Sequence, residues 1–335
     1  MHYELGGIFL LALGFIWLIR LKAEDWGLID VPNERSTHKT FTPRGAGIAF
    51  YLSVMLVTPF FHLDLMLHYL WTTLAIFLVF IVGLLDDHHD TAPQTKFIVL
   101  IISTILLSFD GLMIDDIGVF FGVHLAFGWF AVPFTIFAVT GFTNALNLID
   151  GLDGLAASIS LVILLSFFTI GYMHDDMFMM TLSSVFIMAL CAFLFYNWHP
   201  ASIFMGDSGS LTLGFVISIL SIKSLEYMST VSILFIAAVP ILDTLIVMIR
   251  RKKNGYSMFE ADAYHVHHIL KRFFMGNTVL TVLFLMILQI VYSLTALQFN
   301  KEVDGGILLV LFIANVVVLY IFLDTMKKKQ EKEIE

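Results

Sequence analysis

Charged side chains are scarce in this sequence: Asp, Glu, Lys and Arg make up 13% of its 335 residues, about half the usual share in a soluble protein. Apolar residues make up 59%, and 33 of them are phenylalanine. A water-soluble domain of this size cannot bury so much apolar surface, which excludes a soluble globular protein. At about 20 residues per membrane-crossing helix, the apolar residues supply roughly ten spans. The composition therefore predicts a polytopic helical membrane protein.

Other absences narrow the class further. The one cysteine, Cys191, excludes an intramolecular disulfide. The sequence has no tandem repeat, no low-complexity tract and no soluble insert, so we expect one integral-membrane domain over residues 1–335. No basic region precedes the first apolar run, whereas Arg20 and Lys22 follow it. This pattern predicts an uncleaved first span with its N-terminus outside.

Hydropathy predicts an all-α protein with about eleven transmembrane helices. The predicted spans are 5–21, 45–62, 66–85, 96–109, 129–147, 155–172, 178–197, 209–226, 230–249, 279–297 and 306–324. The stretch 110–128 is too polar at its start and too rich in glycine for a span, and we expect a small outer β-hairpin there. An odd span count places the C-terminus in the cytoplasm, and 16 of the 18 Lys and Arg residues then lie inside. The positive-inside rule favours this orientation.

The densest polar strings fall in the loops predicted on the cytoplasmic side. These loops are 22–44, 86–95, 148–154, 198–208 and 250–278. In the second loop, Asp86, Asp87 and Asp90 place three carboxylates within five residues. Such charges repel each other unless a divalent cation or lysines share them, and Mg²⁺ prefers oxygen ligands and phosphates. The string therefore indicates a metal site, with a solvated acidic loop as the alternative.

A second string repeats polar side chains every three residues at the end of an apolar helix. It consists of Asn144, Asn147, Asp150 and Asp153. On a helical path these side chains lie along one face. Polar groups at this place are costly in lipid, which favours a functional role over a helix end that satisfies only its own caps.

A third string surrounds Asp207, which Gly206 and Gly209 flank. Two such glycines indicate a tight backbone around an anion or a metal, although Asp207 would also cap the helix that follows. Phe204, just before, can stack on a base or pack on a neighbour.

Within the ninth predicted span, Asp243 must be paired or face a cavity, and an interhelix hydrogen bond is the favoured interpretation.

The fourth and fifth strings add cationic and imidazole groups. His265, His267 and His268 place three histidines within four residues, too many for core packing, and phosphate contact is favoured. Without a cysteine nearby, a structural zinc site is not expected. The first inner loop contributes Lys39 and Arg44 among turn residues, either as phosphate ligands or as an ordinary basic loop.

Together the strings predict phosphoryl transfer at the cytosolic membrane face. Carboxylates suit Mg²⁺, Mg²⁺ suits a diphosphate, and cations suit the remaining phosphate charge. The sequence has no acylation elbow, P-loop or dinucleotide fingerprint. The four strings at Asp86, Asn144, Phe204 and His265, in this order, resemble the motifs of the polyprenyl-phosphate N-acetylhexosamine-1-phosphate transferase family. The histidine string is similar to the WecA/TagO-like branch, and the resemblance covers about residues 24–272.

The resemblance implies the reaction and the roles. In this family a polyprenyl phosphate attacks the β-phosphorus of a UDP-N-acetylhexosamine, giving polyprenyl-diphospho-sugar and UMP, with Mg²⁺ or Mn²⁺ required. The residues that it places in catalysis or at the phosphates are Asp86, Asp87, Asp90, His265, His267 and His268. Those that it places at the nucleotide or other substrate groups are Lys39, Asn144, Asn147, Asp150, Asp153, Asn197 and Phe204. Those that it places at the metal are Asp207 and Asp87.

The same resemblance implies the setting. The expected partners are undecaprenyl phosphate, a UDP-N-acetylhexosamine and membrane lipid, with no nucleic acid, in the bacterial inner membrane with the site facing the cytoplasm. UDP-GlcNAc is the default sugar nucleotide, and O-antigen or teichoic acid synthesis is a typical downstream use. The apolar spans leave room for a homodimer. A direct displacement is favoured, because a phosphate monoester with a second pKa of about 6 is mostly a dianion at neutral pH.

Two departures and three alternatives accompany this interpretation. Ala46 stands where the family usually has the first of two glycines, and Ser257-Met258-Phe259 lacks the usual proline. An MraY-type phospho-MurNAc-pentapeptide transferase is the nearest alternative. A membrane prenyltransferase would need a second aspartate-rich motif of similar kind. A cation-coupled transporter would place its site near the midplane between inverted repeats, whereas these acids cluster at one face.

Overall fold

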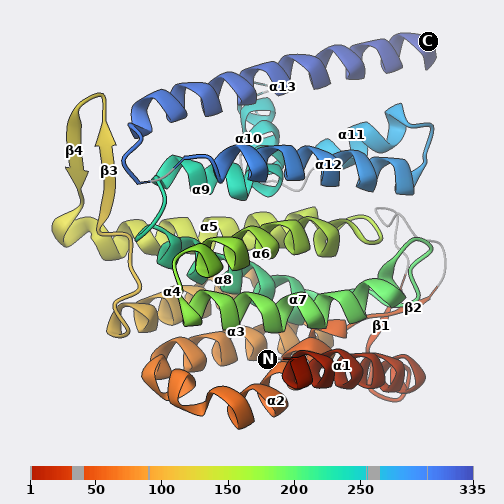
Figure 1. Ribbon diagram of the computed structural model, residues 1–335. Coiled ribbons are helices and arrows are strands. Elements are labelled where there is room, and N and C mark those ends of the chain that lie inside the picture. Colours follow the sequence, from red (N-terminus) through yellow and green to blue (C-terminus); the bar gives the residue numbers. More distant parts are fainter. Residues whose placement is uncertain are drawn as a thin grey trace.

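The computed structural model describes residues 2–31, 41–89, 91–253, 255, 265–299 and 301–334, which form a bundle of helices (Figure 1). The first helices in chain order are α1 (His2–Lys22), α2 (Ala46–His68), α3 (Leu70–His89), α4 (Pro93–Phe109), α5 (Ala131–Ile149), α6 (Leu155–Met173) and α7 (Met177–Asn197). The remaining ones are α8 (Asp207–Ser224), α9 (Thr230–Ile236), α10 (Ala238–Lys253), α11 (Val266–Phe273), α12 (Thr278–Ala296) and α13 (Gly305–Ile334). A short 3₁₀ turn, η1 (Gly128–Phe130), precedes α5.

The described residues include eight helices that are long and apolar enough to cross a membrane. They are α1, α2, α3, α5 with η1, α6, α7, α12 and α13. Each of the eleven predicted spans overlaps a helix, but α4 is short and α8 is not among the eight. The chain is thus a mostly helical multi-pass membrane protein, while the count of eleven and its orientation stay predictions.

The helix α8 is more polar because other helices surround it. Fifteen of its 18 residues are buried, and it packs against α3, α5, α2 and α6. Its hydroxyl groups donate to its own backbone one turn back: Thr212 Oγ1 lies 2.6 Å from the Ser208 carbonyl oxygen, and Ser218 Oγ lies 2.8 Å from that of Gly214. A helix shielded from lipid in this way tolerates serine and threonine at little cost.

The ninth predicted span is not one straight helix. The helices α9 and α10 are bent by 89° relative to each other at a short break, and α10 stands across the direction of its neighbours in Figure 1. Pro240 is the third residue of α10, where a missing backbone N–H breaks no helical hydrogen bond. The bend brings Asp243, on α10, close to the start of α11.

Two small β-pairs lie at opposite ends of the bundle (Figure 1). The pair β3 (Asp116–Phe120) and β4 (Val123–Ala126) is a hairpin within the stretch where one was predicted. The pair β1 (Ile29–Asp30) and β2 (Thr42–Pro43) brackets the first inner loop. The predicted polar strings lie near β1 and β2, so the bundle has a polar end and a hairpin end.

The start of α2 touches the start of α8 through glycine. A Cβ added to Gly47 would lie 2.0 Å from the backbone nitrogen of Gly209, so no side chain fits at this contact. Ala46 is also fully buried, but its backbone N–H donates to the Phe204 carbonyl oxygen at 3.2 Å. Gly47 alone therefore meets the requirement for close approach, which explains why alanine is accommodated at position 46.

Candidate active site

A pocket of about 320 Å³ opens at the polar end of the bundle. Its lining is dominated by carboxylate and amide groups. The lining residues are Asp30, Arg44, Asp86, Asp87, Asn147, Asp150, Gly151, Leu152, Asp153, Asn197, Phe204, Gly206, Asp207, Ser210 and His268. They come from five helices, from β1 and from the loops between these elements, so all five polar strings, which lie far apart in the sequence, contribute to the pocket.

Asp87 joins the end of α3 to the start of α8. Its carboxylate accepts hydrogen bonds from the backbone N–H of Asp207 at 2.8 Å and of Ser208 at 3.1 Å, and from the Ser208 hydroxyl. A carboxylate is favourable at a helix N-terminus, where backbone N–H groups lack partners. A Cβ on Gly206 would lie 2.5 Å from Asp87 Oδ1. Asp87, 2% exposed, is therefore placed to position Asp207.

Asp86 and Asp207 share one ammonium group. Lys96 Nζ lies 2.9 Å from Asp86 Oδ1 and 2.6 Å from Asp207 Oδ2. Asp86 also accepts from the backbone N–H and the hydroxyl of Thr91, at 2.8 and 2.6 Å. Lys96 was not among the predicted site residues. In the sequence, Lys96 is one isolated lysine after an acidic string. The positive-inside rule alone already explained a lysine at this place.

Asn147 supports Asp207 from a second helix. Its amide Nδ2 donates to Asp207 Oδ1 at 3.0 Å and to Ser210 Oγ at 2.8 Å. Asn144, one turn earlier on α5, does not belong to the pocket lining. Of the two asparagines in the predicted string, Asn147 therefore contacts the acidic groups and Asn144 does not line the pocket.

Asp150 lies in the pocket among other carboxylates. Burial, followed by the nearby carboxylates of Asp207 and Asp87, raises the pKa of Asp150 to about 7. Gathering several carboxylates in one half-enclosed pocket is costly unless a cation is close. Lys96 supplies one positive charge, and the remaining acids are suited to a second cation.

Asp153 and Asn197 fasten the loops that form the pocket wall. Asp153 Oδ2 lies 2.6 Å from His199 Nδ1 and accepts from the backbone N–H of Ala201 at 3.1 Å. Asn197, 3% exposed, accepts from Gly154 N–H and donates to the Ile203 carbonyl oxygen, both at 2.9 Å. Because both ends of the Asn197 amide are occupied, its geometry favours a supporting role over nucleotide contact.

The first inner loop contributes Asp30 and Arg44 to the pocket lining. Phe204, predicted at the nucleotide, also lines the pocket, and its backbone N–H donates to the Pro43 carbonyl oxygen at 2.8 Å. Lys39 and Asp90 lie outside the described residues, as does Ser257-Met258-Phe259. Arg44 was expected to be a phosphate ligand or part of an ordinary basic loop, whereas no role was predicted for Asp30.

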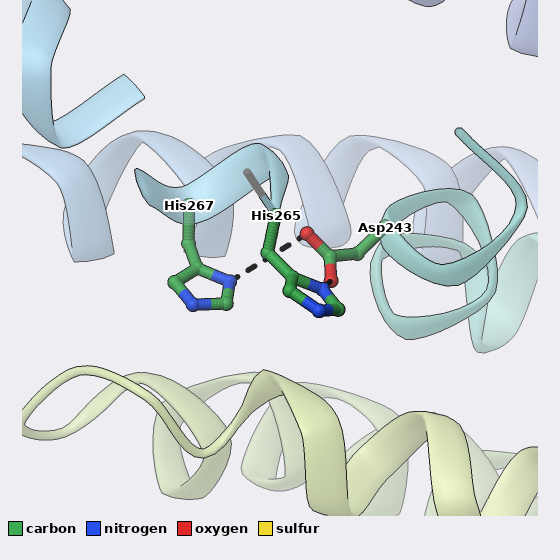
Figure 2. A group of neighbouring side chains, drawn as sticks. All are labelled: Asp243, His265 and His267. Carbon is green, nitrogen blue, oxygen red and sulfur yellow. Dashed lines mark hydrogen bonds and ion pairs between the residues drawn. The ribbon is translucent and has the colours of Figure 1, made fainter. Parts of the chain in front are cut away.

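The three histidines divide between the pocket and the region behind it. His268 lines the pocket, and burial together with the neighbouring His267 and His265 lowers the pKa of His268 to about 3. His265 and His267 are buried beside Asp243 (Figure 2). At neutral pH His268 is therefore an uncharged hydrogen-bonding group.

The comparisons with known proteins agree with this geometry. The model of glycosyl transferase family 4 matches residues 69–225. A probable undecaprenyl-phosphate N-acetylglucosaminyl 1-phosphate transferase of Bacillus subtilis (strain 168) is 34% identical over 86% of this chain and 81% of its own length.

Two enzymes named undecaprenyl-phosphate alpha-N-acetylglucosaminyl 1-phosphate transferase are also similar. That of Yersinia pestis is 30% identical over 81% of this chain and 77% of its own length. That of Escherichia coli (strain K12) is 28% identical over 92% of this chain and 87% of its own length. With the acidic pocket formed by the family's motifs, these matches show that the chain belongs to glycosyl transferase family 4, in the WecA/TagO-like branch of polyprenyl-phosphate N-acetylhexosamine-1-phosphate transferases.

Proposed function

We propose that this protein transfers N-acetylglucosamine 1-phosphate to undecaprenyl phosphate in the membrane. The observation that carries the proposal is a pocket lined by six aspartates and two asparagines at the end of a membrane bundle, where Lys96 pairs with two of the aspartates. Such a pocket suits a cation and a diphosphate, and the relatives named above are transferases of this kind. Their names favour this reaction over the MraY-type alternative.

The sugar nucleotide is proposed to be UDP-GlcNAc, entering from the cytoplasm. The bias of basic residues to the predicted inner loops supports a cytoplasmic pocket in the bacterial inner membrane. Of the predicted nucleotide residues, those that line the pocket are Asn147, Asp150, Asp153, Asn197 and Phe204. Phe204 is suited to stack on the uracil base, and Asp150 is suited to accept from the nucleotide when deprotonated.

The donor set of the pocket fits Mg²⁺ or Mn²⁺. The two carboxylates of Asp86 and Asp207 already converge on a single cationic group, and oxygen atoms are the ligands that these ions prefer. We propose Asp207 as the principal metal ligand, held in place by Asp87 and Asn147. Bound there, the ion would neutralise negative charge on the diphosphate.

The reaction is proposed to be a single displacement. A phosphate oxygen of undecaprenyl phosphate attacks the β-phosphorus of UDP-GlcNAc, a new P–O bond forms, and the bond to the α-phosphate oxygen breaks to release UMP. The attacking phosphate has a second pKa of about 6 and needs no base at neutral pH. The difficulty is the meeting of two anions, and Lys96 and Arg44 are the cationic side chains at the pocket that reduce their repulsion.

Release of UMP by the purified protein tests the proposal. The mixture would hold undecaprenyl phosphate, Mg²⁺ and UDP-GlcNAc in detergent, with parallel reactions on UDP-GalNAc and UDP-MurNAc-pentapeptide. We expect UMP from UDP-GlcNAc that depends on the lipid and disappears with EDTA. UMP from UDP-MurNAc-pentapeptide alone would contradict the proposal, and a stable phospho-aspartate on Asp86 or Asp87 would contradict the single displacement.

A further inference from the structure

Three ionisable side chains meet in the packed interior behind the pocket. Asp243 projects from α10, and His265 and His267 lie at the start of α11 (Figure 2). Their exposed fractions are 2%, 6% and 1%. One ligand atom of each lies within 4.8 Å of the others. Figure 2 shows the two imidazole rings beside the Asp243 carboxylate.

Hydrogen bonding satisfies only part of this cluster. Asp243 Oδ2 lies 2.5 Å from His265 Nδ1, and Asp243 Oδ1 accepts from the Val266 backbone N–H at 2.6 Å. His267 Nδ1 lies 3.5 Å from Asp243 Oδ1, and neither ring nitrogen of His267 has a hydrogen-bond partner. A buried polar atom without a partner lowers the stability of the folded state. The ring nitrogens of His267 can therefore bond to a further group.

The loop between α5 and α6 packs against the imidazole of His267. A Cβ added to Gly151 would lie 2.7 Å from His267 Nε2, so the backbone at position 151 packs against this edge of the ring. The opposite nitrogen, Nδ1, is the one that faces Asp243. The loop thus keeps Nδ1 of His267 directed at the carboxylate.

We propose that Asp243, His265 and His267 bind one transition-metal ion of the zinc class, at a site separate from the acidic pocket. Two imidazole nitrogens and one carboxylate oxygen are a common ligand set for zinc, and they leave one position for a water molecule. Nitrogen ligands favour zinc, whereas the oxygen-lined pocket favours Mg²⁺. The Val266 N–H bond to Asp243 orients the carboxylate, as outer hydrogen bonds do for metal ligands.

The ion takes the place of the proton that Asp243 and His265 share. Two ligands of a tetrahedral zinc lie about 3.3 Å apart, given Zn–N and Zn–O bonds of about 2.0–2.2 Å. The pair at 2.5 Å therefore separates by about 0.8 Å on binding. The ligands bind as a carboxylate and two neutral imidazoles, so any proton held by the cluster is released.

The bound ion would fasten the start of α11 to α10. His268 follows His267 directly, its ring centroid lies 4.3 Å from that of His267, and it lines the pocket. Fixing the first turn of α11 therefore fixes His268 within the pocket. The role is one of positioning, since none of the three ligands lines the pocket itself.

The test is the metal content of purified full-length protein that carries an affinity tag without histidine. After zinc loading and removal of free metal, elemental analysis of the wild type should give about one zinc per chain. His267→Gln and Asp243→Asn should lose it. His124→Gln is the matched control, because His124 forms an exposed ion pair with Asp116 at 2.8 Å and its loss should leave zinc unchanged.

A wild type that retains no zinc, or a zinc content equal in His267→Gln and the wild type, would overturn the proposal in favour of a hydrogen-bonded cluster alone. If both cluster variants fail to fold, visible absorption of wild type loaded with Co²⁺ decides: intense bands of a tetrahedral ion are expected, and their absence overturns the site. Neither measurement uses a sugar nucleotide, so the result is independent of the transferase assay.

Discussion

The acidic pocket and the histidine cluster adjoin each other yet handle buried charge in opposite ways. In the pocket, two carboxylates share the ammonium of Lys96. In the cluster, one carboxylate faces two imidazoles. The pocket is open to ligands, whereas the cluster is closed by packing. The comparison teaches that one fold can balance a buried carboxylate either with an ammonium group or with imidazole groups.

Asp207→Asn should give the largest effect. The change keeps the size of the side chain but removes the charge that Lys96 and Asn147 contact. We expect kcat/KM for UMP release to fall about a thousandfold, in the range of losing one principal electrostatic group. The zinc content should not change. Activity within tenfold of the wild type would show that another residue is the principal metal ligand.

Lys96→Met should lower activity less than Asp207→Asn does. It should also separate the two roles of the lysine, which are to reduce repulsion between the anions and to occupy the oxygens of the acids. The variant keeps an unbranched side chain but leaves the acids of Asp86 and Asp207 without their shared cation. We expect kcat/KM to fall about a hundredfold, while the affinity for Mn²⁺ rises because no ammonium competes for the same oxygens. Titration with Mn²⁺ followed by electron paramagnetic resonance measures this affinity. Weaker Mn²⁺ binding would contradict competition at the acids.

Gly151→Ala should disturb the contact between the two sites. The added methyl group would lie 2.7 Å from His267 Nε2, and overpacking of this kind costs about 1–3 kcal/mol. We expect Tm in detergent to fall by several degrees and zinc to be retained less tightly. Gly141→Ala is the control, since no atom lies within 4 Å of a Cβ there. Equal Tm values for the two variants would contradict the contact.

Asp150→Asn should have the smallest effect, visible in the pH dependence of stability. The pKa of Asp150 is about 7 in the folded protein against an ordinary 3.8, so the folded state binds this proton more tightly. Stability from this group is greatest at low pH and falls as the pH rises from about 4 to 7. The amide variant should therefore gain a few degrees in Tm in EDTA at pH 8 and less at pH 5. A gain independent of pH would contradict the assignment.

The gathering of the acids in one pocket follows from the sequence for a physical reason. Carboxylates at the ends of apolar helices cannot face lipid, so Asp86, Asp150 and Asp207 had to gather in a polar space. The helices themselves follow from long apolar runs, and each predicted span overlaps one. The bend between α9 and α10 was missed because the hydropathy of the segment continues across the break.

The partners of the acids could not be predicted, because tertiary packing chooses them. Lys96 reaches Asp207 across 111 positions and Asp243 reaches His265 across 22, and no local pattern marks either pair. A zinc site was not expected from three histidines without cysteine. The expected interhelix hydrogen bond of Asp243 is confirmed by its contacts with His265 and with the Val266 backbone N–H. The roles of Asp87 and Asn197 likewise depend on which atoms their oxygens face.

The short backbone link between the first inner loop and the segment before α8 has a consequence for biosynthesis. The carbonyl groups of Phe204 and Met205 accept from Ala46 and Gly47 at 3.2 and 3.0 Å. The start of α2 therefore finds its partner only after some 160 further residues have left the ribosome. Until then the wall of the pocket is not formed, and His268 is synthesised later still. A nascent or truncated chain that ends before this point lacks this backbone link and also lacks Asp207.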